Sequence, residues 1–416
     1  MLKIVVSSLS NCREKNGVVT FMEILRRNAA RFGDARIDVA FANYVDFPLR
    51  QEAATTSAQT PGTDAPQRKS RRWAAGIKQG IKAQLAKRPL LAFLMMMATL
   101  SRRALIAVLK ARRLESAGCI HFHQDFFCAV IGQALLRADS RKVLLLHSSD
   151  DSLRQLFVHF HGMRGTRYET LIRQQFHRTL GKLDGIVTLN ERYARTLREQ
   201  FPGVDVRCIY NTSPFASDAE DAHRGLPRAN EAEHKPIEIV AVGSLQHIKG
   251  FDLLVDAAAA LAHEDRARLH VTIVGGGAER TSLQSTIDAN GLQNIITLNG
   301  ETNDVSPFLA RADAYILTSR DEGFPIALIE ASSFGLAIVS TRVGAIPEVF
   351  EEGTCLYIDA RAESIRDALV GIGRGAVDIR ELARRSKFVF DTKLSLEIFL
   401  RAYCRLFTDV GRHHAA

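Results

Sequence analysis

Two glutamates stand eight residues apart in a segment that could bind or activate a polar ligand. Residues 318–330 read TSRDEGFPIALIE, which places Glu322 directly before a glycine and Glu330 inside an otherwise apolar stretch. A buried carboxylate is costly unless hydrogen-bond donors or cations satisfy it. Glu330 is therefore predicted to be either a core acid with a structural partner or a group that binds a ligand.

The elements around these glutamates predict where their carboxylates lie. Residues 314–317 form a short apolar run typical of a buried strand, and Pro325 suits the start of a helix. The chain is thus predicted to pass from a strand through a tight turn at Gly323 into a helix that carries Glu330. In this arrangement Glu322 lies in the loop, Glu330 lies deeper, and both can face one cleft.

Three glycine-containing segments accompany this strand, loop and helix. They are GSLQHIKG at residues 243–250, VGGG at residues 274–277 and TRVGAIPE at residues 341–348. Backbone N–H groups at such turns, where a helix begins, can bind phosphate. Together with the two glutamates, these motifs resemble the retaining, nucleotide-sugar-dependent enzymes called glycosyltransferase family 4. The resemblance covers nearly the whole C-terminal half.

The resemblance implies a fold and a set of donor contacts. It implies an α/β chain with two Rossmann-like, doubly wound domains that face a central cleft (GT-B), and a C-terminal helix that crosses back to the N-domain. It also implies that Glu330 binds the ribose of a nucleotide sugar and that Lys249 binds the diphosphate. Glu322 and the N–H groups of Gly323 and Phe324 are expected to hold the transferred sugar.

Four further positions follow from the same resemblance. Gly17 lies in a glycine turn after the first strand, and Ser244 and Gly275 belong to the donor-side turns. His147 ends an apolar run, and the matching histidine of the family lies beside the reacting sugar. His147 is therefore expected to act there as a hydrogen-bond donor or charge stabiliser on the acceptor side.

The diphosphate site departs from the family pattern. Family members often carry an arginine just after the first glycine of the GSLQHIKG segment or just before its lysine, whereas this chain has Ser244 and Ile248. Arg320 and Arg342 are the two candidates for a replacement cation.

Length and composition bound the remaining possibilities. A chain of 416 residues with 46% hydrophobic residues can form two ordinary domains. Its six cysteines include no C-x-x-C pair, which argues against a disulfide framework or a zinc site and favours a reducing compartment. No D-x-D-type motif lies in a strand context, so neither a metal nor a cofactor is expected, the nucleotide sugar being a co-substrate. No apolar stretch reaches the roughly 18 residues of a membrane-spanning helix.

Four segments are predicted along the chain. Residues 1–211 are the acceptor-side domain, with a basic helical insertion at about residues 65–114. A polar linker at residues 212–236 leads to the nucleotide-sugar-binding domain at residues 237–385. Residues 386–416 are expected to form C-terminal helices.

The insertion at residues 65–114 holds 13 Lys or Arg and no Asp or Glu. Without it the chain has 42 basic against 46 acidic residues, a formal charge of −4 instead of +9. Basic residues flank the apolar runs LLAFLMMMATL and ALIAVL, a pattern that favours docking on an anionic membrane surface. The alternatives are a helical pair that only covers the N-domain core and a nucleic-acid site. The segment holds few aromatic residues and no known nucleic-acid module, so no nucleic-acid partner is expected.

These features predict a retaining, metal-independent hexosyltransferase. A UDP-sugar is favoured as donor, and the acceptor is expected to be a glycan or lipid-linked molecule of cell-surface polysaccharide, lipopolysaccharide or glycolipid synthesis. The expected location is the cytoplasm, peripherally on the membrane. A nucleotide-sugar epimerase or another GT-B enzyme without a membrane acceptor, and a non-enzymatic membrane scaffold, are the alternatives.

Overall fold

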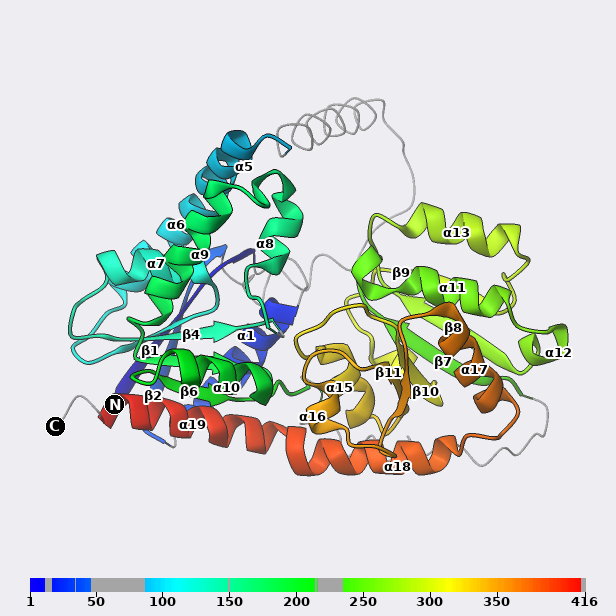
Figure 1. Cartoon of the computed structure of the whole chain (residues 1–416). Helices are drawn as coiled ribbons and strands as arrows, with labels where there is room; N and C mark the ends of the chain where they lie inside the picture. Colours follow the sequence, from blue (N-terminus) through cyan, green and yellow to red (C-terminus); the bar gives the residue numbers. More distant parts are fainter. Residues whose placement is uncertain are drawn as a thin grey trace, which may run out of the picture.

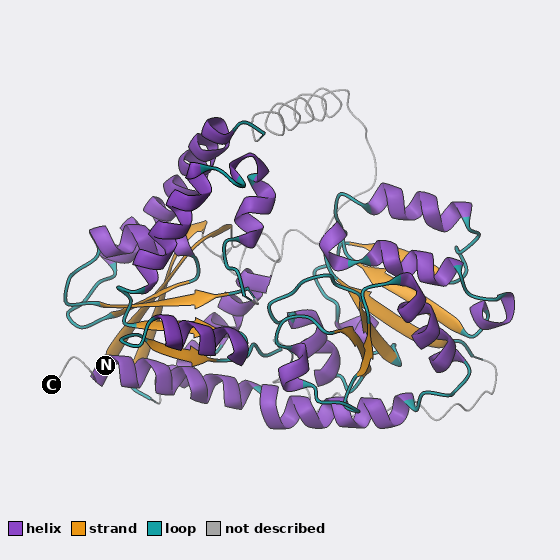
Figure 2. Cartoon of the chain, viewed as in Figure 1, coloured by secondary structure: helices purple, strands orange, loops and turns teal. Residues whose placement is uncertain are grey.

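The computed structural model describes residues 1–11, 17–33, 35–45, 87–148, 150–213, 215 and 235–412. Two parallel six-stranded sheets, each covered by helices, form two domains side by side (Figures 1 and 2). The predicted α/β fold class with two doubly wound domains is confirmed. The predicted linker lies almost entirely outside the described residues, as do residues 65–86 of the basic insertion.

The N-terminal sheet has the strand order β2-β1-β3-β4-β5-β6, and all its neighbouring pairs are parallel. Its central strands are buried on both faces and consist mainly of apolar residues, as expected for a parallel sheet with helices on both sides. Its strands are β1 (Leu2–Asn11), β2 (Ile37–Val45), β3 (Ile120–His123), β4 (Arg141–Leu146), β5 (Gly185–Thr188) and β6 (Asp205–Cys208).

The helices of the N-domain connect these strands. They are α1 (Gly17–Arg27), α2 (Ala29–Gly33), α5 (Pro89–Met96), the π-helical turn η1 (Met97–Ser101), α6 (Arg102–Arg113), α7 (Phe126–Leu135), α8 (Arg154–His159), η2 (His161–Met163), α9 (Arg167–Leu180) and α10 (Glu191–Gln200). Because the strands are parallel, their carboxyl ends share one edge of the sheet, which is where such sheets bind ligands.

The second sheet has the order β12-β11-β10-β7-β8-β9, again with parallel pairs throughout. Its strands are β7 (Ile237–Val242), β8 (Leu269–Val274), β9 (Ile296–Gly300), β10 (Ala314–Leu317), β11 (Ala337–Thr341) and β12 (Leu356–Ile358). Its helices are η3 (His247–Lys249), α11 (Phe251–Ala259), α12 (His263–Arg266), α13 (Arg280–Ala289), α14 (Ser306–Leu309), α15 (Ile326–Ser333), α16 (Ile346–Val349) and α17 (Ala362–Gly373).

The C-terminal helices join the two domains. They are α18 (Ile379–Val389), the π-helical turn η4 (Phe390–Leu394) and α19 (Leu396–Arg412), which run along one side of both domains in Figure 1. The ring of Tyr403 in α19 lies 5.7 Å from the rings of both Phe21 and Phe122 in the N-domain. The predicted return of the last helix to the N-domain is thus confirmed. The predicted boundary after residue 385 falls inside α18.

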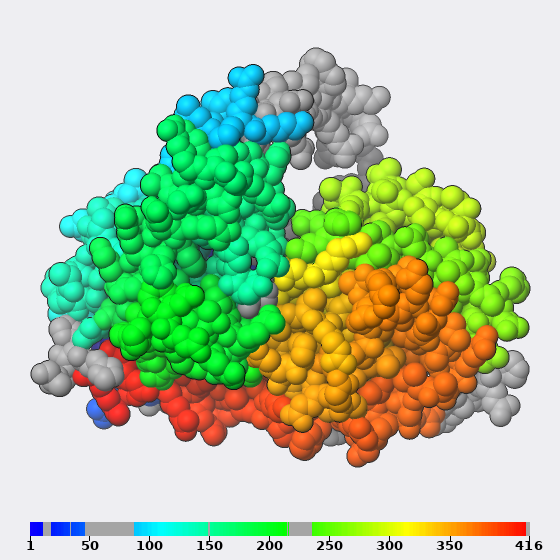
Figure 3. Space-filling model, in the orientation of Figure 1, coloured from blue at the N-terminus to red at the C-terminus, as the bar shows by residue number. Residues whose placement is uncertain are grey.

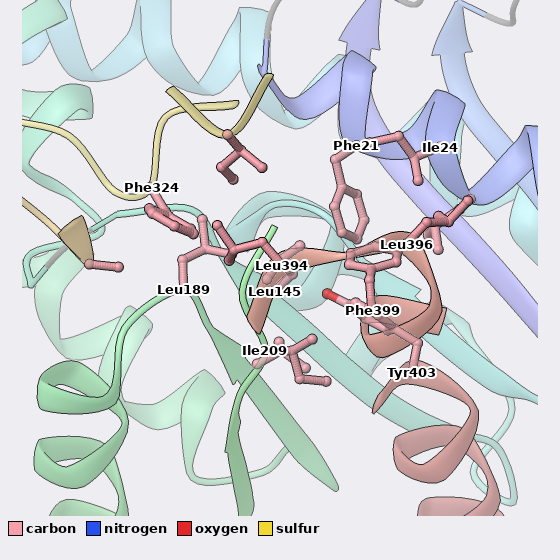
Figure 4. Close-up of a cluster of buried hydrophobic side chains, with 14 of the residues drawn as sticks. Phe21, Ile24, Leu145, Leu189, Ile209, Phe324, Leu394, Leu396, Phe399 and Tyr403 are labelled. Carbon is pink, nitrogen blue, oxygen red and sulfur yellow. The ribbon is translucent and has the colours of Figure 1, made fainter. Parts of the chain in front are cut away.

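One hydrophobic core runs through the contact between the domains. It includes Leu145 and Leu189 of the N-domain, Phe324 of the C-domain and Phe399 of α19, which lie in one cluster in Figure 4. Burial of this apolar surface stabilises the contact of the domains as well as each domain by itself.

The apolar runs of the basic insertion form one continuous helix. Residues Pro89–Arg113 span 25 residues and are long and apolar enough to cross a membrane by length and composition alone, so the expectation that no segment reaches such a length is wrong. The charged residues Arg102 and Arg103 between the two apolar runs do not interrupt the helix, because the backbone continues through residues 101–103 as η1 and α6. One face of this helix packs on the N-domain through Ala92, Met96, Ala104, Ala107, Val108 and Ala111.

Candidate active site at the domain contact

The loop between β10 and α15 joins two of the predicted donor residues. The Nζ atom of Lys249, at the end of η3, lies 2.5 Å from Oε1 of Glu322. The hydroxyl of Ser319 donates to the same carboxylate oxygen at 2.8 Å. A cation and an acid from two loops at the carboxyl edge of the second sheet therefore meet at one point.

Glu330 lies on α15 and is buried, with 8% of its surface exposed. Burial raises the pKa of Tyr315 well above its ordinary value, and the charges of Glu322 and Glu330 raise that pKa further. Both carboxylates therefore lie within electrostatic range of one buried hydroxyl. The prediction that the two acids face one cleft stays a prediction.

The two arginines that could supply a second cation to the diphosphate site are both engaged in ion pairs. Arg320 lies 2.7 Å from Asp252 and also donates to the carbonyl oxygen of His247. Arg342 lies 2.6 Å from Glu352, with its guanidinium over a tyrosine ring. Both candidates for a second cation are thus held by acidic side chains in this structure.

The donor-side turns are close-packed at their glycines. A Cβ atom added to Gly275 would lie 1.8 Å from the carbonyl oxygen of Gly243, so the turns after β7 and β8 can approach each other only without a side chain at this position. Ser244 follows in the first of these turns and is exposed. Backbone rather than side-chain groups line this part of the edge.

His147 follows β4 at the carboxyl edge of the N-terminal sheet. Its Nε2 atom donates to Oε1 of Gln124 at 3.2 Å, and its ring meets Phe21 edge-on. Burial lowers the pKa of His147 to about 4, so the ring is neutral near pH 7. With its hydrogen directed at Gln124, His147 presents Nδ1 as an acceptor, and its predicted role beside the reacting sugar stays a prediction.

The two halves of the site touch at Gly323. A Cβ atom at Gly323 would lie 2.1 Å from the carbonyl oxygen of His147. The Asn211 amide donates to the carbonyl oxygen of Phe324 at 3.1 Å, and Arg154 lies 3.3 Å from Asp321. The loop that carries Glu322 therefore packs directly on the loop that carries His147, and Figure 3 shows the two domains in contact along this side.

The first glycine turn is only partly described. Helix α1 begins at Gly17, directly after a stretch at residues 12–16 that lies outside the described residues. Gly17 is therefore placed at a helix N-terminus above the sheet edge, and its predicted contact with the donor stays a prediction.

Two polar residues of the site were not predicted from the sequence. Ser319 holds Glu322, and Gln124 holds His147. Each stands just after a buried strand, at the carboxyl edge where ligands bind, and that position is the signal that could have identified them. Among the described residues no group of three or more His, Cys, Asp or Glu side chains could hold a metal ion.

Sequence comparison covers the C-domain half of this site. Residues 225–370 match the family model "Glycosyl transferases group 1". An uncharacterized glycosyltransferase of Haemophilus influenzae is 32% identical over 169 residues, which are 39% of this chain and 45% of that protein. The putative colanic acid biosynthesis glycosyltransferase WcaL of Escherichia coli is 26% identical over 58% of this chain and 60% of its own length. The matched part of the chain thus spans about half the length of these relatives.

Solved structures extend the likeness to the whole chain. Anabaena HepE, solved with UDP-glucose, superposes with a TM-score of 0.63 at 15% identity and covers 98% of this chain and 100% of its own. Staphylococcus aureus TarM superposes with a TM-score of 0.57 at 16% identity over 73% of this chain and 59% of its own. The chain has the fold of these glycosyltransferases, and the resemblance to glycosyltransferases predicted from its motifs is confirmed at the level of the group 1 family model.

Proposed function

We propose that this chain, whose residues 225–370 match the group 1 glycosyl transferases, is a retaining glycosyltransferase that uses a UDP-sugar. The observation that carries the proposal is the meeting of Lys249, Glu322 and Gly323 with the His147 loop at the contact of the domains. A nucleotide sugar bound at the carboxyl edge of the second sheet has its sugar at this meeting point. HepE, a structural neighbour over its full length, was solved with UDP-glucose.

In the proposed donor complex a cationic side chain contacts the diphosphate and an acidic side chain contacts the ribose. Lys249 stabilises the diphosphate, whose negative charge grows as the glycosidic bond breaks. Glu330, which lies on α15 beside the donor loop and is 8% exposed, accepts hydrogen bonds from the ribose. Ser244 and Gly275 border the nucleotide through backbone groups, and Gly17 approaches it from the other domain.

The proposed transfer takes place between Glu322 and His147. Glu322 and the N–H groups of Gly323 and Phe324 hold the sugar hydroxyls, and the carboxylate stabilises positive charge at the anomeric carbon. Neutral His147 accepts a hydrogen bond from a sugar or acceptor hydroxyl through Nδ1. The acceptor oxygen attacks from the face that the diphosphate leaves, so the anomeric configuration is retained. No metal and no cofactor take part in this proposal.

The acceptor is proposed to be a glycan or lipid-linked molecule at a membrane surface. Only 28% of the most apolar stretch of helix Pro89–Arg113 is buried inside the protein. Its exposed apolar side chains are Leu90, Leu94, Met97, Leu105 and Leu109, and its exposed basic ones include Arg88, Arg102, Arg103, Arg112 and Arg113. Apolar and basic groups on one helix suit an anionic membrane surface on the cytoplasmic side.

Calorimetric titration of the full chain with UDP, GDP and ADP tests the donor site. We expect UDP to bind, and we expect both Lys249→Ala and Glu330→Ala to weaken this binding by at least about tenfold, because hydrogen bonds to charged groups contribute about 1.5–3 kcal/mol. Lys393→Ala and Glu264→Ala, in ion pairs elsewhere on the C-terminal half, are the matched controls. Equal weak binding of all three nucleotides, or loss of UDP binding in the controls, would refute the proposal.

A further inference from the structure

The first turn of helix α10 in the N-domain is capped by a glutamate of the C-domain. Oε2 of Glu348 accepts the N–H of Glu191 at 2.6 Å, and its Oε1 accepts the N–H of Arg192 at 3.0 Å. Asn190, the N-cap residue of the helix, accepts the next N–H, that of Tyr193, at 2.7 Å. A helix leaves its first N–H groups without internal partners. Here the other domain supplies two of the three acceptors.

Helix α10 is in turn connected to the loop of His147. The hydroxyl of Tyr193 lies 3.2 Å from that of Ser152, and the hydroxyls of Ser152 and Ser148 lie 2.6 Å apart. Ser148 directly follows His147 in the chain. The turn that Glu348 caps is therefore joined through three hydroxyl groups to the residue beside the proposed reaction centre.

On the C-domain side, the segment that carries Glu348 contacts the loop of Glu322. It lies in α16, and the N–H of Ala345, just before this helix, donates to the carbonyl oxygen of Gly323 at 2.9 Å. Gly323 packs on the carbonyl group of His147. The segment of residues 345–348 thus contacts the loop of Glu322 at one end and helix α10 at the other.

We infer that Glu348 is a positioning residue that fixes His147 relative to Glu322 across the domain contact. This inference rests on the proposed function, because it assigns Glu348 a role in assembling that site. A carboxylate at a helix N-terminus combines two charge-assisted hydrogen bonds with the favourable end of the helix dipole. The contact exists only while the domains hold one relative orientation, so it selects the orientation in which both halves of the site meet.

Three variants of the full chain test this inference. Glu348→Ala removes both acceptors, and Glu348→Gln keeps the size but replaces one acceptor by an N–H₂ group that cannot accept. The matched control is Glu397→Gln, which breaks the exposed ion pair of α19 with Arg31 of the N-domain, away from the site. The readouts are hydrogen exchange at the amides of Glu191 and Arg192, the NMR signal of the His147 ring, and the affinity for UDP.

The expected results separate positioning from general stability. In Glu348→Ala the two amides exchange at least about tenfold faster and the His147 ring signal shifts, because the first turn of α10 loses its partners. Glu348→Gln gives a smaller change of the same sign, and Glu397→Gln changes neither signal. UDP affinity stays within about twofold in all variants, because most of its proposed contacts, Lys249 and Glu330 among them, are made by the C-domain away from Glu348.

Two results would overturn the inference. One is unchanged exchange at Glu191 and Arg192 in Glu348→Ala, which would show that Glu348 does not hold the turn. The other is an unchanged His147 signal despite faster exchange, which would show that the turn does not position the histidine. Failure of the wild type to bind UDP would instead refute the proposed function, and the exchange and NMR readouts do not depend on it.

Discussion

The ammonium group of Lys249 and the carboxylate of Glu322 lie 2.5 Å apart, although 73 positions separate them in the chain. One group is proposed to bind the diphosphate and the other the sugar. Their contact means that each partly neutralises the other. A diphosphate carries more negative charge than one carboxylate, so we expect Lys249 to exchange the carboxylate for a phosphate when the donor binds.

Glu322→Gln is therefore expected to change binding and turnover in opposite directions. UDP affinity should rise severalfold, since the neutral amide no longer competes with the diphosphate for Lys249. Turnover should fall about 100-fold or more, because the carboxylate no longer stabilises charge at the anomeric carbon. Calorimetry with UDP and rates with the UDP-sugar that the wild type cleaves fastest measure the two effects. Glu264→Gln is the control, and a parallel loss of affinity and turnover would contradict the assignment.

Gly323→Ala is expected to separate the two halves of the site. Its Cβ atom would lie 2.1 Å from the backbone oxygen of His147, and backbone atoms cannot move aside as a flexible side chain can. Turnover should fall about 100-fold, as expected for a misplacement of about 1 Å. Gly33→Ala, with nothing within 4 Å of the added atom, should leave activity unchanged. An active Gly323→Ala enzyme would show that this contact is dispensable.

The sequence predicted well those features that depend on short stretches of chain. The buried strand before Thr318, the loop at Gly323 and the helix with buried Glu330 follow from local apolar patterns and one proline. The contacts across the site could not be predicted in this way. Lys249 meets Glu322 because two loops of the C-domain approach each other, and Glu348 meets α10 because the two domains pack together. No local pattern encodes either approach.

The charge state of His147 also depends on tertiary structure. Its place after an apolar run indicated a site residue, but only the packing around the ring lowers its pKa to about 4. The basic insertion gives a similar example, because its charged break at residues 101–103 looked like an interruption in the sequence. In the structure the helix continues, since the arginines there are exposed while Ala104 packs on the N-domain.

The exposed face of helix Pro89–Arg113 should determine membrane attachment. Leu90 and Leu94 are 52% and 50% exposed, and replacing both by serine removes apolar surface that a membrane would otherwise bury. Flotation with vesicles that contain phosphatidylglycerol should fall at least about tenfold in the double variant. Phe388→Ser, which removes an exposed ring on α18, is the control. Equal flotation of wild type and double variant would exclude this face as the attachment site.

Fully buried His123 should make the fold sensitive to acid. Burial lowers the pKa of His123 from 6.5 to about 3, so between these values the unfolded chain binds a proton that the folded chain does not. Its contribution to stability is complete above pH 6.5 and is lost as the pH falls towards 3, at about 1.4 kcal/mol per pH unit. Urea unfolding at pH 7, 6 and 5 measures how steeply the free energy of unfolding falls with falling pH. This fall should be smaller in His123→Gln by about 1.4 kcal/mol per pH unit below pH 6.5. Exposed His263→Gln should keep the slope of the wild type, and an unchanged slope in His123→Gln would contradict the expectation.

Gln124 should control the protonation of His147. Its amide oxygen accepts from Nε2 of the ring at 3.2 Å, which fixes the proton on that nitrogen and leaves Nδ1 to accept. In Gln124→Glu a carboxylate takes the place of the amide and favours the charged ring, so the pKa of His147 should rise above its value of about 4. Below that raised pKa the ring is an imidazolium with both nitrogens protonated, and Nδ1 can no longer accept from a substrate hydroxyl. NMR titration of the ring in both proteins measures the pKa directly, and the rate of the variant should fall at pH values below its raised pKa, where the wild-type rate holds, while UDP affinity is unchanged. A raised pKa with an unchanged rate would show that acceptance at Nδ1 is not part of the reaction.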